Sequence, residues 1–549
     1  MIPRSSIVLG TVIVVLGACA PQQPVSPPVP AVPPPPRQTP PPPPPPPPPA
    51  ASAPTEAPEN WQLLDATADR VPGTSAERAY RELLAGRQPA RTVVVAVIDG
   101  GVDTAHVDLR DNLWRNEDET PGNGVDDDGN GYIDDVYGWN FIGNPSGESV
   151  HHDTYEVTRL YVQCTNPETG APAPQDCPAI VADFQKRRQE AEQLHQQVSQ
   201  IAQVLEMTLP TLRRAAGTDS LTEQNVRAIT GGGPDVQRAR SIFLQLAANG
   251  ITPDDVTDAM KELQSQIDYK LNPEFDPRPT VGDDPLNLEE RVYGNADVTG
   301  PDARHGTHVA GIIGAVRGNN VGIDGLAPAV RIMAVRAVPD GDERDKDVAN
   351  AIRYAVDNGA HIINMSFGKS HSPQKSAVDE AVKYAEQHGV LLVHAAGNDG
   401  ENLAESPSFP TRTYLSGGSA SNWIEVGASS WTIDSLAAQF SNYGTQQVDL
   451  FAPGVDVLST VPGGGYDRED GTSMAAPVVS GVAALLMAYH PDLTPAQVRD
   501  ILMQSATRYA DQLVRRPGEA GGTVRFGELS ASGGVVNAYE ALRRAAGTR

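Results

Sequence analysis

The sequence is poor in positive charge and in cysteine, and each shortage narrows what the protein can be. Lys and Arg together number 42 against 69 Asp and Glu, which gives a formal net charge of −27. We therefore expect no nucleic-acid partner and no charge-driven binding to an anionic membrane surface. Only three cysteines occur, Cys19, Cys164 and Cys177, so the chain can form no more than one disulfide within itself.

A long apolar run is also missing at the N-terminus. The run "IVLGTVIVVLGA" after Arg4 is too short to span a membrane comfortably, and such a run after a positive charge is typical of an export signal. Its end, "LGAC" from Leu16 to Cys19, resembles the lipobox of bacterial lipoproteins. That resemblance implies a signal peptide over 1–19 and lipidation of Cys19. Ala20 then favours sorting to the outer membrane, facing the periplasm or the exterior. The alternative is a plain signal peptide with an incidental cysteine.

Two further features suit a protein outside the cytoplasm. Residues 20–58 are dominated by proline, so they cannot bury a core, and polyproline II at about 3.1 Å per residue makes them a semi-rigid linker. A proline-rich ligand for a partner domain is the alternative. Cys164 and Cys177 flank the loop-like stretch "TNPETGAPAPQD". In an oxidising compartment they could form a disulfide, although the sequence alone does not establish the bond.

The rest of the chain alternates between apolar runs and helical patterns. The run at 92–98 ends in Asp99, and the later runs are "RIMAVRAV", "HIINMSF", "VLLVHAAGN" and "WIEVGAS". Helical patterns at 345–360 and 376–389 separate some of them. This alternation predicts an α/β fold with a doubly wound, mostly parallel sheet over 59–547.

Residues 155–285 interrupt that rhythm with a mainly helical insertion. Leu194, Val198, Ile201 and Leu205 recur at helical spacing, which predicts two or more packed helices. The insertion is expected to act as a lid, an exosite or an arm that binds a protein partner.

Three polar residues stand at the ends of predicted elements. Asp99 ends a strand, His305 in "RHGTHVAG" begins a helix rich in small residues, and Ser473 in "DGTSMAAP" begins another. A hydroxyl nucleophile, an imidazole base and a carboxylate that orients the base are what nucleophilic acyl transfer requires. Each motif alone has a plainer interpretation, since a strand-end Asp is often a cap and "HGTH" could bind a metal.

Taken together in the order Asp, His, Ser, these motifs resemble the subtilases, the subtilisin-like serine endopeptidases, over about 90–150 and 290–545. The resemblance implies that Asp99, His305 and Ser473 form the catalytic triad and that polypeptides are the substrates. It also implies that Asn398 in "HAAGND" supplies a side-chain N–H to the oxyanion hole beside the Ser473 backbone N–H. Small residues around Ser473 allow substrate to approach, and Pro477 is expected in the first helical turn.

The same resemblance predicts where substrate binds. Ser366, Phe367 and Gly368 in "NMSFG" would pair with the substrate main chain as an added strand. With "AAGN", which contributes Ala396 and Gly397, they would form the walls of the pocket for the residue before the cut. Asp399 follows at the rim, either to favour a basic residue there or as a solvated loop charge.

Two acidic stretches suggest structural Ca²⁺. "NGVDDDGNGYIDD" offers closely spaced oxygen ligands and a glycine for the sharp turn, although it lacks the final Glu of an EF-hand. The expected ligands are the side chains of Asp126, Asp128, Asn130 and Asp134 with the carbonyl of Tyr132. The alternative is an acidic turn without metal.

A second calcium site is implied by the family resemblance. Asp108 in "HVDL" matches a calcium-binding carboxylate of many subtilases, and the loop "VRGNNVGI" would complete the site through Asn319 or Asn320, with Asn320 preferred. This loop is about one residue longer than the usual subtilase loop, which leaves the ligand register open.

Two features differ from the simplest subtilases, and two other hypotheses for the function remain. Asp99 and His305 lie 206 positions apart, and residues 51–90 are too few for the usual inhibitory propeptide. One rival is a non-catalytic envelope scaffold that uses the fold and the helical insertion to bind a partner. Another is an esterase or transpeptidase on the same fold.

Overall fold

The computed structural model describes residues 56–547 apart from 167–172 and 519–520. Its centre is a nine-stranded sheet in the order β10-β13-β7-β6-β5-β4-β1-β3-β2, parallel except for the pairing of β10 with β13. The strands are β1 (Val93–Asp99), β2 (Gly138–Asn140), β3 (Val330–Arg336), β4 (Ile362–Met365), β5 (Leu391–Ala395), β6 (Trp423–Ser429), β7 (Leu450–Pro453), β10 (Thr507–Arg508) and β13 (Gly534–Val535). Cys19 and nearly all of the linker lie outside the described residues.

The central strands are continuous apolar runs because helices cover both faces of the sheet. Val95 and Val97 of β1 share one core cluster with residues of α8 and α11, whereas Ala96 and Ile98 share another with residues of α9 and α10. The helices are α8 (Arg304–Gly314), α9 (Asp345–Asp357), α10 (Lys375–Gln387), α11 (Thr472–Tyr489), α12 (Pro495–Ser505) and α13 (Ala538–Gly547). The prediction of a doubly wound, mostly parallel α/β sheet is confirmed.

Helix α11 is the central helix of this core. By length and composition it is apolar enough to cross a membrane, yet the whole of it is buried inside the protein. It contacts β4, β5, β6 and α8. A helix that is apolar all round and fully enclosed belongs to the core of a large domain.

The segment before β1 packs onto the same core. It contains a 3₁₀ turn (Trp61–Leu63) and helix α2 (Ala76–Glu82). Trp61 is fully buried, and its indole N–H donates to the Val455 carbonyl at 3.0 Å. Tyr80 on α2 donates to the Leu326 carbonyl at 2.6 Å. These contacts make the segment an integral part of the folded domain.

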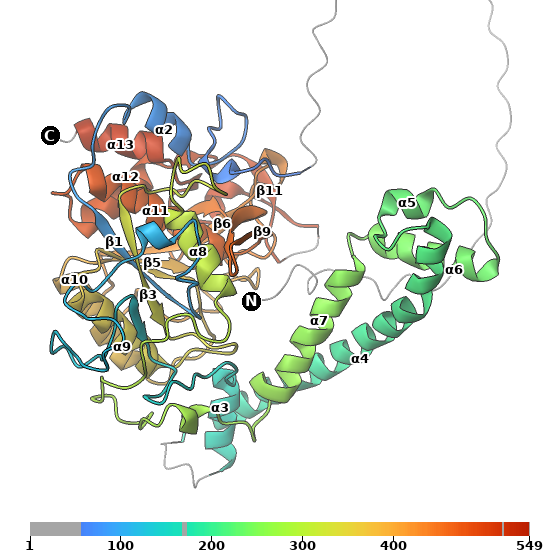
Figure 1. Ribbon diagram of the computed structural model, residues 1–549, viewed down its shortest axis with the longest axis horizontal. Coiled ribbons are helices and arrows are strands. Elements are labelled where there is room, and N and C mark those ends of the chain that lie inside the picture. Colours follow the sequence, from blue (N-terminus) through green and yellow to red (C-terminus); the bar gives the residue numbers. More distant parts are fainter. Residues whose placement is uncertain (1–55, 167–172, 519–520, 548–549) are drawn as a thin grey trace, which may run out of the picture.

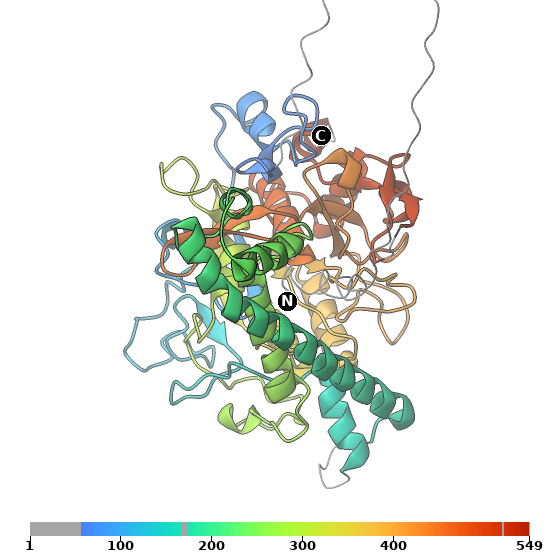
Figure 2. The same cartoon turned by 90° about the vertical axis from the view of Figure 1, so that its right-hand side faces the viewer.

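Between β2 and α8 the chain forms a helical projection, seen clearly in Figure 1 and from the side in Figure 2. Helices α4 and α7 lie side by side and reach away from the sheet, with α5 and α6 at the far end. The helices are α3 (Glu156–Thr165), α4 (Cys177–Ala216), α5 (Glu223–Arg227), α6 (Pro234–Ala247) and α7 (Pro253–Ser265), followed by a π-helical turn (Gln266–Lys270). We call α4 to α7 the helical arm.

The helical arm has a small core of its own. Val198 and Leu205 of α4 pack against Val256 and Leu263 of α7. At its base, a disulfide joins Cys164 near the end of α3 to Cys177 at the start of α4, with the two Cα atoms 5.4 Å apart. The base of the insertion is therefore linked covalently as well as by packing.

Buried ion pairs tie the base of the insertion to the sheet domain. The Lys369 ammonium lies 2.8 Å from Glu156 of α3 and 2.9 Å from Asp345 of α9. Lys270 lies 2.7 Å from Asp340. Lys369 is 1% exposed at its side chain, and breaking a pair at such depth is strongly destabilising. The insertion thus joins the sheet domain one residue after Gly368, a predicted wall of the substrate pocket.

Two small hairpins complete the described fold. One pairs β8 (Val457–Val461) with β9 (Gly465–Glu469), and the other pairs β11 (Leu513–Arg515) with β12 (Thr523–Arg525). The β8–β9 hairpin packs along α8, where Ser459 and Thr460 donate hydroxyl hydrogen bonds, each of 2.7 Å, to carbonyls of that helix.

Candidate active site

The predicted catalytic residues converge on one edge of the sheet. Asp99 is the last residue of β1, Ser366 follows β4, and Asn398 lies three residues beyond β5. These three strands are neighbours in the order β5-β4-β1. The carboxyl edge of such a sheet is where open α/β folds build their sites.

Asp99 and His305 form a close, largely buried pair. Nδ1 of His305 lies 2.7 Å from Oδ1 and 2.9 Å from Oδ2 of Asp99, which also accepts the Gly100 N–H. The start of α8 can come this close to the end of β1 only with a glycine at position 306, because a Cβ on Gly306 would lie 2.2 Å from the Gly101 carbonyl oxygen. Burial disfavours the imidazolium, but the charge and hydrogen bond of Asp99 outweigh it and raise the pKa of His305.

Ser473 is the second residue of α11 and is held by Ser366. Its hydroxyl donates to the Ser366 carbonyl at 3.2 Å, and the Ser366 hydroxyl donates to the Ser473 carbonyl at 2.9 Å. Nε2 of His305 is buried and has no hydrogen-bond partner among the described residues. The Ser473 hydroxyl is thus hydrogen-bonded to Ser366 and not to His305. Catalytic hydrogen bonds of this kind are often absent or long before substrate binds.

Pro477 explains why that carbonyl is available. The expectation that Pro477 lies in the first helical turn is wrong, because it is the sixth residue of α11. A proline in a helix interior has no N–H for the carbonyl four positions earlier, here that of Ser473. The Ser366 hydroxyl takes the place of that missing donor.

Asn398 is fixed at the start of α11 through its side-chain oxygen. Its Oδ1 accepts the backbone N–H of Thr472 at 2.9 Å and the Thr472 hydroxyl at 3.0 Å. Its Nδ2 lies 3.6 Å from the position that a Cβ on Gly471 would occupy. The amide donor, the helix N-terminus and Ser473 therefore lie together, as an oxyanion hole requires. The sequence did not reveal the orienting role of Thr472.

The predicted pocket walls are built from glycines that cannot be replaced freely. Gly397 has φ +102°, and a Cβ there would lie 2.4 Å from Nδ2 of Asn442. A Cβ on Gly368 would lie 2.6 Å from the Ser408 hydroxyl, which is also 3.6 Å from the corresponding position on Gly397. Ser408 thus lies between the two walls, a placement that the sequence did not reveal.

Ala396 and Phe367 are two further predicted wall residues. Ala396 is fully buried, and its carbonyl accepts from Asn442 at 2.9 Å. The Phe367 ring is half-buried and lies edge-on to His394, with ring centroids 6.3 Å apart.

The helical arm reaches the rim of these walls. Arg187 of α4 donates to the Ser370 hydroxyl at 3.3 Å, and Asp183 lies 3.5 Å from His371. Desolvation by the surrounding atoms raises the pKa of Asp399, while the hydrogen bond that Asn442 donates to it and the charge of Arg187 act in the opposite direction. Asp399 is therefore an exposed carboxylate at the rim, and it lies within the electrostatic reach of the arm.

The acidic loop before β2 gathers carboxylates, but not all of those predicted. Ligand oxygens of Glu119, Asp128 and Asp135 all lie within 4.8 Å of one another. Glu119 and Asp135 were not expected from the motif. Burial raises the pKa of Asp135 to about 6 despite hydrogen bonds from Tyr354, Asn116 and Asn130. A buried carboxylate among others is a donor set that suits a hard divalent cation.

The other expected ligands of that loop have different partners. Asp126 accepts the N–H groups of Gly129, Asn130 and Gly131. Asp134 accepts those of Asn123 and Gly124. Oδ1 of Asn130 accepts the Tyr132 N–H, and its amide donates to Asp128 and Asp135. These side chains shape the turn, because short Asx bonds satisfy its backbone amides.

The second candidate calcium site, at Asp108, stays a prediction, and the structure shows which groups surround its carboxylate. Its carboxylate accepts the Asn319 amide at 2.7 Å, the Ile323 N–H at 3.1 Å and the Tyr466 hydroxyl at 3.2 Å. Asn319 and not the preferred Asn320 makes this contact. These three hydrogen bonds close the loop around Asp108.

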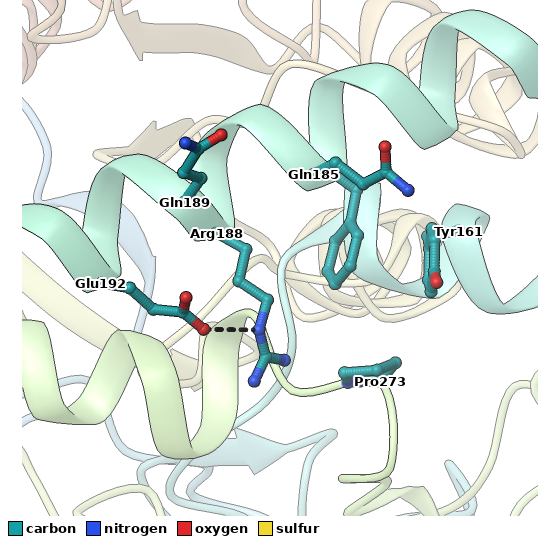
Figure 3. A pocket seen from close by; sticks show the side chains of 7 residues that line it. Tyr161, Gln185, Arg188, Gln189, Glu192 and Pro273 are labelled. Atoms are coloured by element: carbon teal, nitrogen blue, oxygen red, sulfur yellow. Dashed lines mark hydrogen bonds and ion pairs between the residues drawn. The ribbon is translucent and has the colours of Figure 1, made fainter.

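A hollow of about 370 Å³ lies between α3 and α4, away from these residues (Figure 3). The Tyr161 and Phe184 rings that line it stack with centroids 4.0 Å apart, and Arg188 pairs with Glu192 one turn further along α4 at 3.0 Å. Its place at the base of the insertion separates it from the triad.

The comparisons with known proteins agree with the geometry. The model of the subtilase family, Peptidase_S8, matches residues 90–521, and the chain belongs to that family. The chain is 42% identical over 226 residues to a thermophilic serine proteinase of Bacillus sp. (strain AK1), an alignment that covers 41% of this chain and 50% of that protein. It is 38% identical to subtilisin BL of Lederbergia lenta over 44% of this chain and 77% of that protein.

A solved cold-adapted subtilisin-like serine proteinase is 32% identical to the chain, with a TM-score of 0.34, over 43% of this chain and 77% of that one. The chain spans about half the length of the curated relatives that it matches first.

Proposed function

We propose that the protein is a serine endopeptidase that hydrolyses peptide bonds through an acyl-enzyme on Ser473. The observation that carries this proposal is the Asp99–His305 pair, in which Nδ1 is engaged by the carboxylate and Nε2 has no partner among the described residues. An imidazole fixed in this tautomer has its free nitrogen ready to accept a proton. Subtilase membership gives the same assignment independently.

In the first half of the reaction, Ser473 attacks the scissile carbonyl. Its hydroxyl leaves the Ser366 carbonyl and gives its proton to Nε2 of His305, while Asp99 stabilises the imidazolium. The oxyanion receives hydrogen bonds from the Asn398 amide and the Ser473 N–H, and losing one such donor costs about 10²–10³ in turnover. The imidazolium then protonates the departing amine.

In the second half, water attacks the acyl-enzyme with His305 again as base. The same donors hold the second oxyanion, and the acid product leaves as Ser473 regains its proton. All the groups that this cycle requires are on β1, α8, α11 and the loop after β5.

Polypeptides are the expected substrates of this site. Residues 366–368 continue from β4 at the open edge of the site, where an extended peptide can add as a strand. Ser408 between Gly368 and Gly397 narrows the space for the substrate side chain before the cut. We propose a preference for small to medium side chains there.

A structural Ca²⁺ ion is proposed at the loop before β2. Glu119, Asp128 and Asp135 would hold it, with Asn130 beside them. A bound divalent cation would offset the cost of the buried Asp135 carboxylate. This site would stabilise the fold and would take no part in the chemistry.

The protein is proposed to be anchored in the bacterial cell envelope by a lipid on Cys19. The lipobox-like "LGAC" and the proline-rich linker support this proposal. The Cys164–Cys177 disulfide adds support, because such bonds persist in oxidising compartments. The helical arm is proposed to bind a protein partner or to restrict access to the site, since its α4 contacts the segment after Gly368.

The experiment that tests the activity is labelling with a fluorophosphonate probe. Wild type is expected to be labelled, and the Ser473→Ala and His305→Ala variants are expected to remain unlabelled while folded. Equal labelling of the Ser473→Ala variant, or no labelling of folded wild type, would contradict the proposal and favour a scaffold role.

A further inference from the structure

Glu469, the last residue of β9, is a buried carboxylate that the proposed mechanism does not use. Its side chain is 11% exposed, and its Oε1 lies 2.9 Å from Nε of Arg304. Its Oε2 is buried without a hydrogen-bond partner among the residues that the structure describes. A buried carboxylate oxygen without a hydrogen bond lowers the stability of the folded protein, so we expect a function that explains why Glu469 occupies this position.

Arg304 connects this carboxylate to the catalytic base. It is the first residue of α8 and directly precedes His305, and its guanidinium also lies 2.6 Å from Asp467 on the same hairpin. The β8–β9 hairpin leads within four residues from Glu469 to Ser473. The Arg304–Glu469 pair therefore joins the helix that carries the base to the segment that carries the nucleophile.

The charges around His305 are few within the described chain. Asp99 on β1 and, after it, Glu469 on β9 are the anions that most favour its protonated form. Arg304 is cationic, and burial lowers the pKa of the neighbouring His308 to about 3, so that ring is neutral. Ser473 on α11 and Ser366 after β4 bring no charge.

We propose that Glu469 is a positioning residue whose carboxylate stabilises the imidazolium form of His305, the form present after Ser473 has given up its proton. The inference rests on the proposed role of His305 as the general base. Arg304 holds Oε1, which leaves Oε2 directed at no other group, and the low exposure limits screening by solvent and salt. The interaction of Glu469 with His305 is mutual, since the His305 charge also lowers the pKa of Glu469 against the effect of burial.

The test is a direct titration of His305 in protein labelled with ¹³C at histidine, with the resonance assigned by its loss in a His305→Gln variant. In Glu469→Gln, the midpoint of His305 is expected to fall by about half a pH unit or more, because an anion that favours the imidazolium is gone. The acid limb of kcat/KM should move to lower pH by the same amount, with the plateau kcat about threefold lower or more. Glu469→Ala is a second neutral replacement with the same expected shift.

Asp467→Asn is the matched control. Asp467 is on the same hairpin and pairs with the same Arg304, but its side chain is 55% exposed, so the midpoint should move by less than about 0.2 units. An unchanged midpoint in whichever neutral Glu469 variant folds, or an equal shift in Asp467→Asn, would overturn the inference. Because the titration needs no turnover, a midpoint that shifts in a protein that cleaves nothing would refute the proposed function but not the electrostatic interaction between Glu469 and His305.

Discussion

Ser366 and Ser473 exchange two hydrogen bonds, each serine donating its hydroxyl to the carbonyl of the other. The exchange is possible because Pro477 leaves the Ser473 carbonyl without its helical donor. Ser366 is in turn held by the Asn364 amide at 3.0 Å, and Asn364 accepts from Ser480 of α11 at 2.8 Å. A buried polar chain thus fixes the start of α11 against β4.

Removing the Ser366 hydroxyl should therefore destabilise the fold. In Ser366→Ala the buried Ser473 carbonyl loses its donor, and we expect unfolding to become easier by about 1–3 kcal/mol. Urea unfolding of an inactive Ser473→Ala background measures this without self-digestion. Ser370→Ala, at an exposed position in the same segment, should change stability by less than about 0.5 kcal/mol. Equal stability of the two variants would contradict the proposal that the Ser366–Ser473 hydrogen bonds stabilise the fold.

Thr472 should matter for turnover more than for substrate binding. Thr472→Val removes the hydroxyl that donates to Asn398 and accepts the Gly397 N–H at 3.1 Å. The amide donor is then less well fixed, so kcat should fall about tenfold with little change in KM. Thr472→Ser keeps the hydroxyl and should stay within about twofold of wild type. The two variants are compared by steady-state kinetics on one peptide, and a change confined to KM would count against the assignment.

Breaking the ion pairs of Lys369 should weaken the link between the insertion and the sheet domain. Lys369→Met leaves Glu156 and Asp345 facing an apolar side chain, and we expect a loss of about 3–5 kcal/mol. Lys261→Met on α7 removes an exposed pair with Asp258 and should cost less than about 1 kcal/mol. Thermal unfolding of both variants provides the comparison, and a mild effect of Lys369→Met would show that packing alone holds the base of the insertion.

Neutralising Asp135 should distinguish a loop that binds Ca²⁺ from an acidic turn that binds no metal. Without added Ca²⁺, Asp135→Asn is expected to raise Tm, because it removes a buried carboxylate whose pKa is raised to about 6. The gain in Tm that Ca²⁺ gives wild type should be absent from this variant. Asp127→Asn, at an exposed loop carboxylate, should keep the calcium response. A wild-type Tm that is insensitive to Ca²⁺ and to chelator would refute the site.

Much of the fold and of the triad could be predicted because their signals are local. The buried runs that became β1, β3, β4, β5 and β6 are continuous in sequence; Asp99 ends β1, and Asn398 lies three residues beyond β5. Parallel strands bring such ends to one edge, so even the 206 positions between Asp99 and His305 did not hide the site.

The parts that could not be predicted depend on which way side chains point in the folded protein. Thr472, Ser408 and Glu469 acquire roles only when loops and the β8–β9 hairpin fold over the edge of the sheet. In the acidic loop, Asp134 and Asp135 are adjacent, yet only the second joins Glu119 and Asp128. The helical spacing in α4 predicted helices there but not that the arm reaches Ser370 and His371.

The measurement that tests the central claim most directly is cleavage of a fluorescently labelled, unfolded polypeptide by wild type and by Ser473→Ala, with the products identified by mass spectrometry. Wild type is expected to release internal fragments, and the variant to lose at least about 10³-fold in rate while remaining folded. Internal cleavage that persists in Ser473→Ala, or a folded wild type that cleaves simple esters but no peptide bond, would contradict the assignment of Ser473 as the nucleophile of an endopeptidase.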